Sequence, residues 1–308
     1  MAESLTHIPR IDVHAHCGDP EQMELYVQIA TALRQGHGEH LAAWVDLNFR
    51  RPVEVSDEHY LETTERLGLR FLPCLHEAIA NGLQYTPQDL ESWQRRGVAG
   101  LKIWVGVSDA IDRPEHDPVF DKMVEIGLPG ASIHIAQPCP TSWCEDPIAF
   151  WQAQKAWERV LDRHPDLLVI NAHMLDHFYS DEQLDYLDYM LTTYPKLHVD
   201  LAARFQQFHR MGYDKLRDFV IRWADRILFG TDIGKVGQPA GQMAERYHRC
   251  FRLLESDEVV TGSFFGEKTE RRGLGLPGEV LEKIYYRNAA RIYPRVGDTL
   301  RGQGYPLP

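Results

Sequence analysis

The sequence is short of positive charge and has no long apolar segment. Its 308 residues include 33 lysines and arginines against 45 aspartates and glutamates, which gives a formal net charge of −12. A surface of that sign repels nucleic-acid backbones and anionic membrane surfaces, so we expect neither as a partner. The stretch 127–147 is broken by three prolines and cannot form an apolar helix of about 20 residues.

Cysteines are few and scattered. The chain has five, at positions 17, 74, 139, 144 and 250, an odd number without the spacing of a disulfide framework. This usage is typical of proteins in reducing compartments. The first ten residues contain Glu3 and Pro9 and lack the apolar core of a secretory signal. We therefore expect a cytoplasmic protein.

A glycine-rich phosphate turn is also missing, because Cys17-Gly18-Asp19-Pro20 follows the first apolar run. The chain has instead eight short apolar runs whose starts lie about 31 residues apart, the length of a strand with its crossover helix. The runs are continuous, as expected for parallel strands buried on both faces. We therefore predict an α/β protein, a (β/α)8 or TIM barrel, that forms a single domain over residues 1–308. The runs cover 11–16, 43–49, 69–75, 100–107, 131–136, 167–173, 197–201 and 226–230.

Two connections, after the first and eighth predicted strands, are longer than the others. We expect each to contain a helix, over 21–33 and 241–254, and the second to end in a charged, glycine-containing loop over 264–275. A closing amphipathic helix is predicted over 277–293. Helix starts are indicated by Ser56, Thr86 and Ser180. Loops at the carboxyl ends of barrel strands carry active sites, so both long loops should border one.

Histidine is unusually frequent, with 15 residues. His14 and His16 end the first predicted strand and, because strand side chains alternate, point to one face with Cα atoms about 6.6 Å apart. His134, His173 and Asp232 end or follow the fifth, sixth and eighth runs. Each alone is explained more simply as a hydrogen-bonded core histidine or a helix N-cap. Together at one end of a barrel they would be costly to bury unless paired or coordinated, and they suit Zn²⁺, with Mn²⁺, Fe²⁺ or Co²⁺ as alternatives.

Several segments resemble the amidohydrolase superfamily. They are residues 11–16 (IDVHAH), 100–103 (GLKI), 171–174 (NAHM), 227–232 (ILFGTD) and 282–291 (EKIYYRNAAR), together with His134 in the fifth run. Within the superfamily the chain is most similar to the amidohydrolase-related branch, which holds metal-dependent hydrolases and aminocarboxymuconate-semialdehyde decarboxylase. The resemblance covers nearly the whole chain and implies a TIM barrel with a divalent metal as cofactor.

The resemblance also implies roles for the polar residues at the strand ends. His14, His16, His134 and Asp232 would hold a single metal ion, with Zn²⁺ expected first. Asp232 would also be catalytic, because it would accept the proton of an activated water and pass it to a leaving group. His173 would stand near that water and the substrate as a second catalytic residue, which polarises a carbonyl or relays protons.

Two cations are candidates for binding the substrate. Lys102 shares strand parity with Trp104, so both are expected to face the barrel interior. Lys102 could contact a substrate anion, form an ion pair with Asp12 or Asp200, or carry the carbamate that bridges two metals in binuclear members of the superfamily. Arg204, just past the seventh strand, could bind a substrate carboxylate or form a loop ion pair. Weaker candidates for specificity are Asn48, Arg51, His76 and Glu77.

The combined pattern favours a metal-dependent hydrolase that acts on a C–O or C–N bond of a small, anionic substrate, such as a lactone, ester or amide. The alternative is non-oxidative decarboxylation of an unsaturated or aromatic acid, a carbon–carbon lyase reaction at the same metal. The His-x-His pair formed by His14 and His16 favours hydrolysis over decarboxylation. A non-catalytic barrel would have no need of all five polar residues. We expect a small-molecule substrate as the partner and allow for a homodimer.

Overall fold

In the computed structural model, eight parallel strands follow one another around a barrel in sequence order, from β1 to β8. The structure describes residues 5–50, 57–68, 70–106, 109–135, 146–233, 239–264 and 267–305. The amide of Val13 donates to the carbonyl of Phe229, and Ala15 bridges Ile233, so β8 meets β1 and the barrel is nearly closed. The predicted TIM barrel is confirmed.

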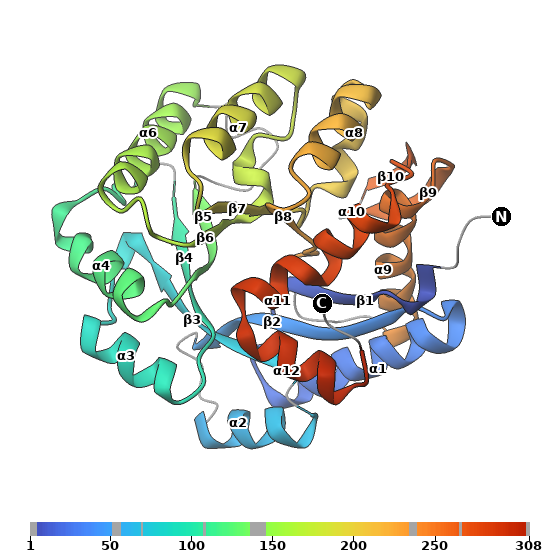
Figure 1. Cartoon of the computed structure of the whole chain (residues 1–308), viewed down its shortest axis with the longest axis horizontal. Helices are drawn as coiled ribbons and strands as arrows, with labels where there is room; N and C mark the ends of the chain where they lie inside the picture. The colour runs from blue at the N-terminus through green and yellow to red at the C-terminus, as the bar shows by residue number, and fades with distance from the viewer. Residues whose placement is uncertain are drawn as a thin grey trace.

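All eight predicted strands are present, and their side chains are mostly buried because helices cover the outside of the barrel (Figure 1). The barrel strands are β1 (Pro9–Ala15), β2 (His40–Arg50), β3 (Phe71–Ala78), β4 (Gly100–Val105), β5 (Gly130–Ile135), β6 (Val169–Asn171), β7 (Leu197–Asp200) and β8 (Ile227–Leu228).

Helices lie around the strands in the order that the chain supplies them. The predicted starts at Thr86 and Ser180 are confirmed, since Thr86 forms a capping box with Asp89 and Ser180 accepts from the amide of Gln183. Ser56 lies outside the described residues. The helices are α1 (Pro20–His37), α2 (Asp57–Arg66), α3 (Pro87–Arg95), α4 (Asp117–Ile126), α6 (Pro147–Arg163), α7 (Asp181–Thr193), α8 (Tyr213–Arg222), α9 (Ala240–Glu255), α10 (Gly278–Glu282), α11 (Asn288–Ile292) and α12 (Pro294–Gly302).

The two long connections differ from each other in the structure. After β1 only residues 16–19 precede α1, which packs against α9, and these two helices confirm the ones predicted over 21–33 and 241–254. After β8 the chain does make a long excursion, with α9 and an antiparallel hairpin of β9 (Val259–Phe264) and β10 (Glu267–Arg272), where a loop was predicted. The closing helix is present but is interrupted by a π-helical turn over Lys283–Arg287.

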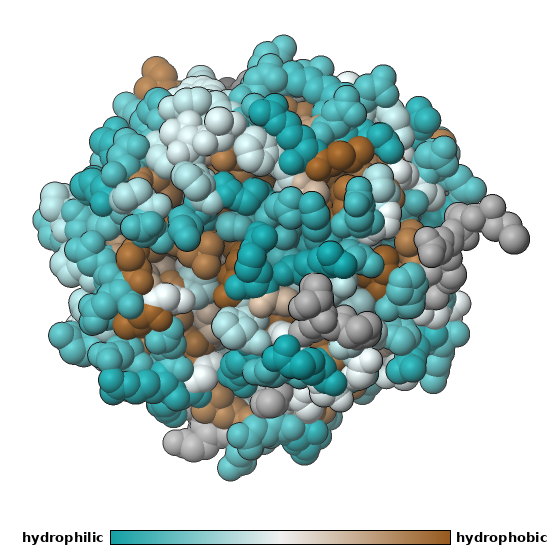
Figure 2. Space-filling model, viewed as in Figure 1, coloured by the Kyte–Doolittle hydropathy of each residue, from teal (hydrophilic) through white to brown (hydrophobic). Residues whose placement is uncertain are grey.

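The face of the molecule shown in Figure 2 is mainly hydrophilic. On the face shown in Figure 2, hydrophobic residues lie in several separate places between hydrophilic ones. No helix within the described ranges is long and apolar enough to cross a membrane.

Candidate metal-binding active site

Five polar side chains converge at the carboxyl ends of four barrel strands, as the sequence predicts. His14 lies in β1 and His134 in β5, whereas His16, His173 and Asp232 follow β1, β6 and β8. Asp232 Oδ1 lies 2.8 Å from His16 Nε2 and 3.5 Å from His14 Nε2. The ring centroid of His173 lies 4.9 Å from that of His14 and 5.2 Å from that of His134.

The imidazole of His14 is oriented from behind by Asp200. His14 Nδ1 lies 2.8 Å from Asp200 Oδ2, and both side chains are at most 1% exposed. Because Nδ1 donates to this carboxylate, His14 Nε2 carries the lone pair, and Nε2 is buried with no hydrogen-bond partner among the described residues. A carboxylate behind a histidine in this way is typical of metal sites, where it fixes the tautomer and makes the free nitrogen more basic.

His173 is held in a similar way. Its Nδ1 lies 2.9 Å from the carbonyl oxygen of Ala202, which leaves Nε2 as the acceptor atom. Burial, with the charges of Arg204 and His14, lowers the pKa of His173 to about 3, so its imidazole is neutral near pH 7. A neutral imidazole with a free Nε2 can bind a metal or take up a proton.

Asp232 is the anionic partner of these histidines. Burial alone would raise its pKa, but the hydrogen bond from His16 and the electrostatic interactions with the three surrounding histidines together outweigh burial and hold the pKa of Asp232 well below its usual range. Its backbone amide donates to the carbonyl of His14 at 2.9 Å. Asp12 anchors the preceding residue, because its carboxylate accepts from both the amide and the hydroxyl of Thr231.

These residues fit a divalent metal ion. In the described part of the chain, His14, His173 and Asp232 form the one group of three potential ligands whose donor atoms all lie within 4.8 Å of one another. Both ring nitrogens of His134 are buried and have no hydrogen-bond partner within the same ranges. Unpartnered nitrogens are costly to bury, and imidazole and carboxylate are ligands of Zn²⁺. The predicted ligand set of four therefore has His173 as a fifth candidate.

Close backbone approach brings β8 against His14. A Cβ atom built on Gly230 would lie only 2.9 Å from Cβ of His14, a distance at which one of them must shift. The glycine in the 227–232 segment therefore leaves the space that the histidine occupies.

Lys102 faces the same interior region, as predicted. Its Nζ donates to Ser132 Oγ at 3.2 Å, and the next inward residue of β4, Trp104, stacks on His134 with ring centroids 5.9 Å apart. The charge of Lys102 contributes to a lowered pKa of His14 and of His134, after burial, which is the main cause. Its role in substrate binding stays a prediction.

Arg204 lies behind His173 and is only 1% exposed. Its Nε donates to the carbonyl of His173 at 3.0 Å, one Nη donates to the carbonyl of Ala203 at 2.8 Å, and the other pairs with Asp176. The predicted substrate-binding role of Arg204 stays a prediction, and these contacts favour a different role.

Two buried aspartates that hold residues of the candidate site in place were not identified as such from the sequence. Asp12 and Asp200 were considered only as ion-pair partners of Lys102, although an aspartate inside a buried, otherwise apolar strand is itself a signal of a paired group. Of the weaker candidates, Glu77 lies in β3 and accepts from the backbone amides of Gln84 and Tyr85 further along the chain. Arg51 and the side chain of Asn48 lie outside the described residues.

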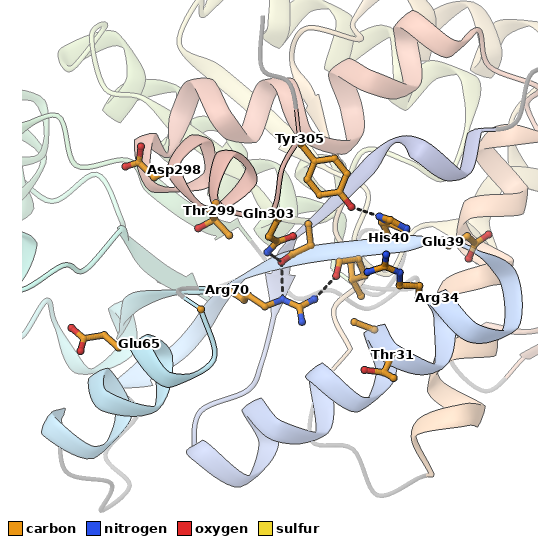
Figure 3. A pocket seen from close by; sticks show the side chains of 15 residues that line it. Thr31, Arg34, Glu39, His40, Glu65, Arg70, Asp298, Thr299, Gln303 and Tyr305 are labelled. Carbon is orange, nitrogen blue, oxygen red and sulfur yellow. Dashed lines mark hydrogen bonds between the residues drawn. The ribbon is translucent and has the colours of Figure 1, made fainter.

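A separate cavity of about 790 Å³ lies at the opposite end of the barrel (Figure 3). It is bordered by the start of β2, by Arg70 just before β3, and by α12. Arg70 donates to the carbonyls of Leu41 and Ala42, and His40 contacts the hydroxyl of Tyr305. These contacts brace the amino-terminal ends of β2 and β3, at the end of the barrel opposite to the candidate metal ligands.

Comparison with known families matches residues 11–295 to a family model described as "Amidohydrolase". The match includes His14, His134, His173 and Asp232. No curated protein sequence matches the chain.

Solved structures share the fold. An uncharacterised TIM-barrel protein from Bordetella bronchiseptica has a TM-score of 0.56 at 15% identity, over 94% of this chain and 100% of its own. Dihydroorotase from Saccharomyces cerevisiae has a TM-score of 0.55 at 13% identity, over 93% and 84%. A dihydroxybenzoic acid decarboxylase from Polaromonas sp. JS666, with bound manganese, has a TM-score of 0.51 at 14% identity, over 93% and 97%. At these identities the likeness is one of fold.

Proposed function

Because the chain belongs to the amidohydrolase family of metal-dependent enzymes, we propose that it is a hydrolase that cleaves a C–O or C–N bond in a small substrate such as a lactone, ester or amide. The observation that carries the proposal is the convergence of His14, His173 and Asp232, with donor atoms within 4.8 Å of one another, at the end of the barrel where active sites lie. We propose Zn²⁺ as the metal and a cytoplasmic location.

The roles of the protein groups follow from their protonation states. When bound, the metal would supply a Lewis acid that makes water a nucleophile near pH 7. Asp232 is ionised, so its carboxylate can accept a proton from water and deliver it to the leaving nitrogen or oxygen. His173 Nε2 is an acceptor, because Nδ1 donates to Ala202. This tautomer favours metal binding or proton uptake by His173 over donation to a substrate carbonyl.

The substrate would be anionic in this proposal. The ammonium group of Lys102 is buried at the side of the site, where low polarity strengthens its attraction for a carboxylate. Arg204 contributes positive charge nearby, although its three nitrogens donate to protein acceptors.

Lys102 also supports decarboxylation, which is the second candidate reaction. Lys102 could hold the carboxylate of an unsaturated or aromatic acid, and Asp232 or His173 could return a proton to carbon after CO2 leaves. The dihydroxybenzoic acid decarboxylase among the similar structures suggests aromatic acids as the substrate class for this alternative, and the suggestion rests on likeness of fold alone.

A substrate panel separates the two reactions. Protein loaded with Zn²⁺ or Mn²⁺ is offered lactones, esters and amides with acid release as the readout, and dihydroxybenzoates and unsaturated acids with CO2 release as the readout. The proposal predicts metal-dependent acid release that metal-free protein lacks. CO2 release alone would establish the alternative, and turnover that survives complete metal removal would contradict both.

A further inference from the structure

The chain takes an unusual path directly after β6. Four consecutive residues with side chains, His173, Met174, Leu175 and Asp176, have φ angles of 58°, 56°, 55° and 57°. The left-handed conformation is disfavoured for residues that carry a Cβ and usually occurs in single residues. A turn of four such residues therefore needs contacts from elsewhere in the fold to hold it.

Unfavourable backbone geometry is concentrated at this end of the barrel. In the described ranges, the other non-glycine residues with positive φ are Ala203, after β7, and Asp232, after β8. All six thus follow β6, β7 or β8, beside the candidate ligands. Strained backbone that gathers in one place indicates a site where side-chain position matters.

Arg204 connects the two ends of the left-handed turn. Its Nε donates to the carbonyl of His173, the first residue of the turn, and an Nη pairs with the carboxylate of Asp176, the last. Both partners of this ion pair are at most 2% exposed. The planar guanidinium group has several donors in a fixed geometry, which lysine does not provide.

The end of β7 and the short segment after it also fix three separate atoms of His173. Asp200 Oδ1 accepts from the backbone amide of His173 at 2.9 Å, and the carbonyl of Ala202 accepts from Nδ1 at 2.9 Å. Arg204 binds the carbonyl oxygen of the same residue. The backbone and the ring of His173 are therefore both set by residues 200–204.

We infer that Arg204 and Asp176 are positioning residues, which clamp the left-handed turn so that His173 presents Nε2 toward His14 and Asp232. The inference rests on the proposed function for the purpose of that geometry. It gives Arg204 a role away from the substrate, and it makes the Arg204–Asp176 pair a determinant of metal affinity.

Three variants test the clamp. Arg204→Met removes every hydrogen-bond donor of the side chain but keeps a similar side-chain length. Arg204→Lys keeps the positive charge without the planar guanidinium group. Asp176→Asn keeps a hydrogen-bond acceptor without the negative charge. Arg10→Met is the matched control, because Arg10 is equally buried and also pairs with a carboxylate, that of Glu255, but lies near the start of β1. The readouts are the Kd for Zn²⁺, by competition with a chromophoric chelator, and the tautomer of His173 in metal-free protein, by ¹⁵N NMR.

We expect Arg204→Met to weaken Zn²⁺ binding about 10–100-fold and to let His173 populate both tautomers. Arg204→Lys should bind Zn²⁺ more tightly than Arg204→Met. The Zn²⁺ affinity of Asp176→Asn should lie between those of Arg204→Lys and the wild type. Arg10→Met should lower the melting temperature but leave the Kd and the tautomer unchanged.

Two results would overturn the inference: folded Arg204 or Asp176 variants that keep the wild-type Kd within twofold and a single Nδ1–H tautomer, or equal losses in Arg10→Met. If Arg204→Met does not fold, the lysine and asparagine variants decide. A wild-type protein that binds no Zn²⁺ would instead contradict the proposed function, and the tautomer in metal-free protein would still test the clamp.

Discussion

The carboxylate of Asp200 joins two histidines of the candidate site from behind. Oδ2 lies 2.8 Å from His14 Nδ1, and Oδ1 accepts from the backbone amide of His173 at 2.9 Å. Burial would raise the pKa of Asp200, but the interactions with His14 and His173 together outweigh burial and lower the pKa overall. One buried anion on β7 thus sets the orientation of ligands on β1 and after β6.

Replacing Asp200 with asparagine should weaken metal binding by about 10–100-fold, since an amide makes His14 a poorer ligand. The Kd for Zn²⁺ measures the change, and circular dichroism checks the fold. Glu39→Gln is the matched control, because Glu39 lies 2.8 Å from His248 Nδ1 in another carboxylate–histidine pair away from the site. Equal Kd values for the Asp200 variant and wild type would contradict the role of Asp200.

The variant Asp232→Asn should lose turnover by about 10²–10⁴-fold, because an amide cannot accept the proton of water. Its melting temperature should stay close to that of wild type, since an asparagine can keep one contact to His16. Steady-state kinetics on the substrate identified by the panel measures the loss. Activity retained in this variant would remove Asp232 from the mechanism.

A methyl group at position 230 should disturb the metal site although no ligand is replaced. Gly230→Ala places Cβ about 2.9 Å from that of His14, so His14 must move and Zn²⁺ affinity should fall. Gly241→Ala is the control, because a Cβ on Gly241 meets no atom within 4 Å and the residue is the second of helix α9. If both variants bind Zn²⁺ like wild type, the close approach has no part in positioning His14.

His177 predicts a pH dependence of stability. It is fully buried among the rings of Phe150, Trp151 and Tyr186, and burial lowers its pKa to about 3. An unfolded chain has a histidine pKa near 6.5, so between about pH 6.5 and 3 the unfolded state binds the extra proton. The free energy of unfolding should therefore fall as pH falls through that window, by up to about 1.4 kcal/mol per pH unit.

Urea unfolding of wild type and His177→Phe at several pH values isolates this contribution. Phenylalanine keeps a ring in the aromatic surroundings and cannot titrate, so the variant should lose less stability between pH 7 and 5 than wild type. Parallel curves for the two proteins would contradict a neutral, buried His177.

The sequence was most informative where local rules apply. Thr86 and Asp89 have the spacing of a capping box, and the structure has that box. Alternation along β1 correctly places His14 and His16 close together, with ring centroids 5.2 Å apart. These features depend on residues within a few positions of one another, which a single sequence displays directly.

The features that could not be predicted depend on distant residues. His173-Met174-Leu175-Asp176 contains no glycine, so nothing local indicates a left-handed turn, and its conformation is held by Arg204 about 30 positions later. The same contacts favour a positioning role for Arg204, and its predicted role in substrate binding stays a prediction. The hairpin of β9 and β10 is charged and partly exposed, so its sequence predicts a loop, and only pairing makes it a sheet.

The central claim is that His14, His173 and Asp232 hold a divalent metal ion, and a crystal structure of Zn²⁺-loaded protein, with anomalous data at the zinc edge, tests it most directly. We predict a single anomalous peak about 2.0–2.2 Å from a nitrogen of His14 and His173 and from an oxygen of Asp232. Two peaks joined at Lys102 would replace the single ion with a bridged pair. No peak among these residues would contradict the account.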